Sequence, residues 1–191
     1  MYNLQNNTER ILKFIQGNPG MHLRQIKKEL QLSLGTIQYH LTLLEKSGRI
    51  VSERRYFRRT YFPVGTFEKN EKSILKILKR GNLKTILLFI MEKKNPTQTD
   101  IANGVDLSNS TVNWHLKYML ENKIIYEIRD GKFKRYQVWD GKTIIKLMKD
   151  YHPSLWNNWN HRIIGMFLTL WYYVALESYN SLDSLSAILE L

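Results

Sequence analysis

The sequence predicts a mostly α, α+β protein: two similar units, each of three helices and a β-hairpin, followed by a C-terminal helical segment. Three observations predict this class. The chain repeats itself at an offset of 75 residues, the apolar period changes from about 3.6 toward 2 late in each copy, and an apolar stripe at helical spacing follows the second copy.

The repeat is free of gaps. Residues 7–64 align with residues 82–139, and 14 of the 58 aligned positions are identical. The identities include polar as well as apolar positions, among them Ser33 with Ser108, Thr36 with Thr111, His40 with His115 and Tyr61 with Tyr136. Two unrelated segments of similar composition would rarely match in both respects, so the chain is expected to contain one unit twice.

Each copy is expected to begin with three helices. Asn7 and Asn82 are the predicted N-caps of the first helices, and Ser33 and Ser108 are the predicted N-caps of the third. The second helices are expected over Leu23–Leu30 and Thr99–Val105. Ile37, Leu41 and Leu44, and their counterparts Val112, Leu116 and Met119, are expected on the inner faces of the third helices.

A hairpin is expected after each third helix. The predicted strands are Ile50–Glu53 with Thr60–Val64, and Ile124–Ile128 with Arg135–Trp139. Asp130-Gly131 is typical of a type I′ turn, whereas the first hairpin turns near Tyr56-Phe57 without a glycine.

The expected organisation has four parts: 1–65, a linker helix over 66–81, 82–141, and a C-terminal segment over 142–191. Glu71–Arg80 is amphipathic, with Gly81 as its expected C-cap, so the two units should be held at a fixed spacing. A further helix is expected over Thr143–Asp150.

The charge is strongly positive and unevenly placed. The net charge is +12, and residues 1–151 alone carry +14, which indicates a polyanionic partner such as nucleic acid or an anionic membrane surface. The chain has no cysteine, which excludes disulfide scaffolds, thiolate metal sites and cysteine nucleophiles. No signal peptide is visible, and the longest uncharged stretch, 14 residues, is too short to span a bilayer, so a cytoplasmic location is expected.

A third helix capped by serine and followed by a basic hairpin is the order of a winged helix-turn-helix. Residues 33–50 and 108–125 share the spacing S-x-x-T-[IV]-x-[YW]-H-L and resemble the recognition-helix segment of ArsR/MarR-like winged-helix regulators. Over residues 7–139 the chain is similar to tandem winged helix-turn-helix transcription regulators common in archaea. Lys123 departs from the pattern because it stands where Gly48 does, and the missing thiolates put metal sensing outside the resemblance.

The resemblance implies sequence-specific binding of double-stranded DNA in transcription regulation. In the first copy the expected DNA contacts are Ser33, Thr36, Gln38, Tyr39, His40, Arg54, Arg55, Arg58 and Arg59. In the second copy they are Ser108, Ser110, Thr111, Asn113, Trp114, Lys117, Arg129, Lys132 and Lys134. Gln38 and Asn113 share one position and are of the residue type that reads adenine, while the hairpin cations suit phosphates. For His40 and His115, phosphate contact and a packing position both stay open.

The residues after the second copy predict a homodimer. An a/d-like stripe is widened by further aromatic residues, and its expected dimerisation residues are Trp159, Ile163, Met166, Phe167, Leu170 and Trp171. Packing on the second unit, an effector pocket and a membrane-surface contact are the alternatives.

No nucleophile elbow, carboxylate pair or phosphate loop is present, so the protein is not expected to be an enzyme, and no cofactor or metal is expected. A tandem winged-helix protein-interaction module, such as a general transcription factor or scaffold subunit, is the main alternative function. A structured-RNA binder and a membrane-tethered regulator are two others.

Overall fold

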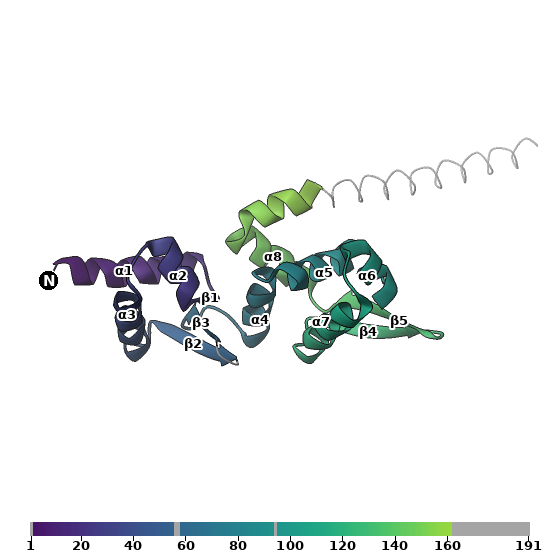
Figure 1. Cartoon of the computed structure of the whole chain (residues 1–191), viewed down its shortest axis with the longest axis horizontal. Coiled ribbons are helices and arrows are strands. Elements are labelled where there is room, and N and C mark those ends of the chain that lie inside the picture. Colours follow the sequence, from purple (N-terminus) through teal and green to yellow (C-terminus); the bar gives the residue numbers. More distant parts are fainter. Residues whose placement is uncertain (1, 56–57, 94, 162–191) are drawn as a thin grey trace, which may run out of the picture. The chain divides into compact units, whose positions relative to one another are not determined.

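The computed structural model describes residues 2–55, 58–93 and 95–161 (Figure 1). The chain divides into two compact units, Met1–Tyr151 and His152–Leu191. Within the first, helices alternate with short antiparallel sheets, so the expected mostly α, α+β class is confirmed.

The first copy of the repeat holds three helices and three strands. They are α1 (Tyr2–Gly17), β1 (Met21–His22), α2 (Leu23–Leu30), α3 (Leu34–Lys46), β2 (Ile50–Arg55) and β3 (Arg58–Pro63). The sheet is antiparallel in the order β1-β3-β2, with Ile50 opposite Pro63 and Arg55 opposite Arg58. The two-residue strand β1 was not predicted, because it is too short to show a period.

The second copy repeats this order. It comprises α5 (Gly81–Glu92), α6 (Gln98–Val105), α7 (Asn109–Glu121), β4 (Ile125–Asp130) and β5 (Phe133–Val138), and α8 (Gly141–Tyr151) follows. Both hairpins are longer than predicted, and the second turns at Gly131, whose φ is +58°. The bridge between Thr97 and Arg135 lies 75 residues after the pairing of His22 with Thr60.

Backbone geometry confirms the repeat where the sequences differ. Residues with positive φ recur at the 75-residue offset: Gly20 (+81°) with Asn95 (+55°), Gln31 (+55°) with Asp106 (+54°), and Gly48 (+66°) with Lys123 (+53°). Lys123 therefore adopts the left-handed turn of Gly48 without a glycine, at a cost of about 1 kcal/mol. The missing glycine leaves the turn unchanged.

The structure corrects three expected helix ends. Asn7 lies inside α1, because no glycine or proline interrupts the helical residues before it. Asn82 also lies inside a helix, since Arg80 is the N-cap of α5. Gly81 begins α5 instead of ending α4 (Lys69–Leu78), whose C-cap is Lys79.

The linker helix α4 is tied to the first copy. Four apolar side chains on it are buried: Ile74, Leu75, Ile77 and Leu78. On β2, the Glu53 carboxylate pairs with Lys72 at 3.3 Å and with Lys76. Burial alone would raise the pKa of Glu53, but these two ammonium groups lower it below the usual value. The linker is therefore a packed element.

Each third helix buries one stripe in its own core. In α3 the buried residues are Ile37, Leu41 and Leu44, which pack with Ile11, Ile15 and Ile26 of the first two helices. In α7 the corresponding residues Val112, Leu116 and Met119 are buried as well. Because each large apolar side chain gains about 1.5–3 kcal/mol on burial, this stripe fixes the rotation of the helix.

After α8, residues 153–161 are helical, and Trp159 is 3% exposed with its ring 6.0 Å from that of Trp156. The other predicted dimerisation residues, Ile163, Met166, Phe167, Leu170 and Trp171, lie outside the described residues. Within the described part of the chain, no helix has both the length and the apolar character needed to cross a membrane.

Candidate nucleic-acid interface

The solvent face of α3 presents polar and aromatic side chains. Gln38 and Thr42 are exposed, and Tyr39 is 54% exposed. Ser33 begins the helix as predicted: its Oγ accepts a hydrogen bond from the Thr36 amide at 3.1 Å. The hydroxyls of Ser33 and Thr36 also lie 2.7 Å apart, so part of their hydrogen-bonding capacity is used by the cap.

The face of α7 has the same layout. Ser110, Asn113 and Lys117 are exposed, and Trp114, at the position of Tyr39, is 60% exposed. Ser108 caps the helix through the Thr111 amide at 3.2 Å. The rotation set by the buried stripe therefore turns the same positions to solvent in both copies.

The structure contradicts the predicted contact of His40 with DNA. Its side chain is 0% exposed, and its Nδ1 lies 2.8 Å from Oγ1 of Thr8 on α1. A side chain without exposed surface cannot reach a duplex, so His40 is a packing residue that ties α3 to α1. In the second copy Leu83 stands at the position of Thr8 and carries no hydroxyl. The half-buried His115, at the position of His40, therefore cannot make the same contact.

Burial also affects the titration of these two histidines. It lowers the pKa of His40 below the usual value. The pKa of His115 is lowered by burial and, to a lesser extent, by the charge of Arg80. Both rings therefore favour the neutral form in the folded chain.

The first hairpin carries four arginines. Arg54 and Arg59 are exposed, and Arg59 Nη1 lies 3.6 Å from Oε2 of Glu45 on α3. Arg55 and Arg58 are direct partners across the hairpin, beside residues 56–57, which lie outside the described residues. The strand register therefore brings positions 55 and 58 to the same end of the hairpin.

Acidic neighbours offset part of the charge on the second hairpin. Lys134 pairs with Glu127 at 3.1 Å, and Arg135 pairs with Asp130 at 2.6 Å. The ammonium of Lys132 lies 5.3 Å from the centre of the Phe133 ring. Arg129, the counterpart of Arg54, is exposed.

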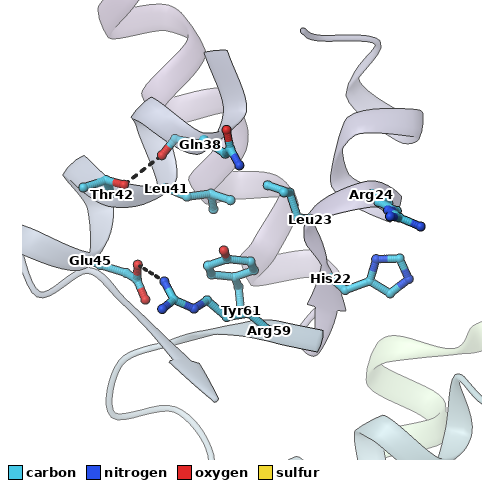
Figure 2. Close-up of a pocket in the computed structure, with 9 residues that line it drawn as sticks. All are labelled: His22, Leu23, Arg24, Gln38, Leu41, Thr42, Glu45, Arg59 and Tyr61. Carbon is cyan, nitrogen blue, oxygen red and sulfur yellow. Dashed lines mark hydrogen bonds and ion pairs between the residues drawn. The ribbon is translucent and has the colours of Figure 1, made fainter. Parts of the chain in front are cut away.

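A groove of about 700 Å³ lies between α3 and β3 (Figure 2). It is lined by His22, Leu23, Arg24, Gln38, Leu41, Thr42, Glu45, Arg59 and Tyr61. Sequence reasoning missed the groove, because its walls come from four separate elements, β1, α2, α3 and β3. The identity of Tyr61 and Tyr136 in the repeat was the available signal, since each lines a hollow beside the hairpin of its own copy, although α7 does not line the second hollow.

This arrangement suits a duplex nucleic acid. A helix with exposed polar side chains fits the major groove of DNA, and arginines on an adjacent hairpin can reach the phosphates. Among the described residues, no group of three or more His, Asp or Glu side chains is placed to hold a metal ion.

Family models match both copies. One, described as an N-terminal HTH domain, matches residues 5–75, and another, described as winged helix-turn-helix DNA-binding, matches residues 79–126. The predicted resemblance to a tandem winged helix-turn-helix protein is therefore confirmed.

A curated relative is the uncharacterized HTH-type transcriptional regulator MJ1398 of Methanocaldococcus jannaschii. It is 30% identical over 148 residues, which cover 76% of this chain. The match spans only 36% of the length of that relative.

Parts of the chain are also similar to solved structures. Reduced HlyU from Vibrio cholerae is 15% identical and covers 43% of this chain and 90% of its own, with a TM-score of 0.37. The complex of S. aureus MepR with DNA is 18% identical and covers 59% of this chain and 87% of that one, with a TM-score of 0.34.

The buried His40 predicts a loss of stability in mild acid. Its pKa is lower in the folded than in the unfolded chain, so as the pH falls through about 6.5 the unfolded chain takes up a proton that the folded chain resists. The stability contributed by neutral His40 is present above that pH and lost below it. Thermal unfolding from about pH 7.5 to 5.5 should therefore show a smaller decline for His40→Gln than for the wild type. His161→Gln removes an exposed histidine and is the control; an equal decline in His40→Gln and wild type contradicts the assignment.

Proposed function

We propose that this tandem winged helix-turn-helix protein binds double-stranded DNA in a sequence-specific manner and regulates transcription. The observation that carries the proposal is the exposed polar face of α3 beside a hairpin with four arginines. The family match over residues 5–75 and the charge of +14 on residues 1–151 support it.

Affinity and specificity come from different residues. Arg54 and Arg59 of the first hairpin, and Arg129 of the second, would contact phosphates and supply most of the salt-dependent affinity. Gln38 and Asn113 are the proposed base readers, since an amide side chain can bond adenine in a bidentate manner. Ser33, Thr36, Tyr39 and their counterparts in α7 would border these readers.

Protein contact is a second candidate for the second copy alone. Three exposed aromatic side chains favour it: Trp114 (60%), Phe133 (50%) and Trp139 (61%). Aromatic residues are enriched at protein interfaces, and the acid-paired cations of this hairpin reduce its attraction to DNA.

The C-terminal stripe is proposed to hold a homodimer, because the sequence predicts a helix there whose many large apolar side chains would gain by leaving water. Two copies of the chain would present paired readers to a palindromic site. A cytoplasmic location and a lack of catalytic activity stay predictions from the sequence.

Base reading by Gln38 predicts a change at one position of the bound sequence. In selection from a random duplex library, Gln38→Ala should lose preference at one base pair, a loss of about 1–3 kcal/mol. Asn113→Ala is the matched variant in the second copy, and an effect there separates DNA reading from protein contact. An unchanged motif from Gln38→Ala contradicts base reading by Gln38.

The dimer proposal predicts a mass of twice 22.8 kDa for the full chain in solution. Light scattering at micromolar concentration measures that mass directly. A monomer at this concentration contradicts the proposal, and the stripe is then left to the alternative contacts.

A further inference from the structure

We propose that the groove between α3 and β3 seats one backbone phosphate of the duplex, and that Glu45 is the counter-ion which this phosphate displaces from Arg59. The inference rests on the proposed function. The phosphate is a contact to the duplex backbone, and the Glu45 carboxylate weakens that contact.

Glu45 lies on the DNA-facing side of α3. Gln38, Thr42 and Glu45 are spaced four and three residues apart, so they share one face of the helix, and all three line the groove (Figure 2). Arg59 faces them from β3, and its Nη1 lies 3.6 Å from Oε2 of Glu45. A phosphate that approaches Arg59 must therefore compete with a carboxylate on the reading helix itself.

Two further groups of the groove suit an anion. Tyr61 is buried, and the pKa of its hydroxyl is raised by burial and by the charge of Glu45, so the group stays a neutral donor. Arg24 lines the groove from α2 and is exposed. Within the described part of the chain, Arg24 takes part in none of the ion pairs. The groove therefore offers two cations and a hydroxyl against one carboxylate.

The second copy repeats the paired hairpin cation and the tyrosine, but its hollow is not lined by α7. Lys134 stands at the position of Arg59 and pairs with Glu127 at 3.1 Å, and Tyr136 stands at the position of Tyr61. Glu127 comes from β4, however, whereas the position of Glu45 is occupied by Leu120. Both copies thus place this hairpin cation beside a carboxylate and a tyrosine, and each draws the carboxylate from a different element.

The Arg59–Glu45 pair is weak enough to be displaced. The Arg59 side chain is 52% exposed, and exposed ion pairs contribute little because solvent screens them. Two oxygens of one phosphate can together accept a bidentate pair of hydrogen bonds from the arginine guanidinium. Removal of the Glu45 charge should therefore tighten duplex binding about two- to fivefold, whatever the base sequence.

The test is a double-variant cycle on the full chain. Fluorescence anisotropy with a random-sequence duplex, from about 50 to 200 mM salt, gives the affinity and its salt dependence for the wild type, Glu45→Gln, Arg59→Ala and the double variant. We expect tighter binding and a steeper salt dependence for Glu45→Gln, weaker binding for Arg59→Ala, and no effect of Glu45→Gln once Arg59 is absent. Glu29→Gln makes the same charge change on the exposed surface of α2 and should leave the affinity within twofold.

The outcomes separate the two claims. Equal gains from Glu45→Gln with and without Arg59 show general repulsion and overturn the counter-ion role, as does unchanged binding. Glu45→Ala should give the same gain in affinity as Glu45→Gln, since the gain depends only on loss of the charge. This second variant excludes a new contact made by the glutamine side chain. A wild type without salt-dependent duplex binding overturns the proposed function itself, together with this inference.

Discussion

Burial of one apolar stripe on each third helix determines which side chains remain for a partner. In α3 the stripe is Ile37, Leu41 and Leu44, each at most 1% exposed, and the opposite face is left to Gln38 and Tyr39. Rotation of the helix by a quarter turn would expose the stripe at a cost of several kcal/mol. The same stripe in α7 turns the matching positions outward. The packing of the core therefore determines the candidate interface. A substitution in the stripe would disturb the interface even though the substituted residue does not contact DNA.

Contacts between residues close in sequence were predictable, and contacts between residues distant in sequence were not. Ser33 was identified as a cap because its partner is three residues away, whereas the contact of His40 with Thr8 joins residues 32 apart. Nothing in the pattern separates an exposed histidine from a buried one at the edge of an apolar stripe. Gly81 was misassigned because a glycine between two helices can end one or begin the other, and here only two residues separate α4 from α5. The groove was not predicted because the residues of its walls are distant in sequence.

Cations on both hairpins of this protein pair with neighbouring carboxylates. The cation at the position of Arg59 and Lys134 is paired with an acid in both copies. Arginines that are always free would bind any polyanion strongly, whereas a paired cation binds only a phosphate that is placed to displace its partner. Pairing of Glu53 with two lysines of α4 serves another end, since it attaches the linker helix to the hairpin.

The central claim is that the outward face of α3 contacts duplex DNA, and site-specific photo-cross-linking tests it most directly. A benzophenone amino acid placed at Tyr39 should cross-link to a random-sequence duplex at low salt, because that side chain is 54% exposed on the reading face. The same probe at Lys13, exposed on α1, should cross-link far less. Equal cross-linking at both positions, or cross-linking at Lys13 alone, contradicts the account.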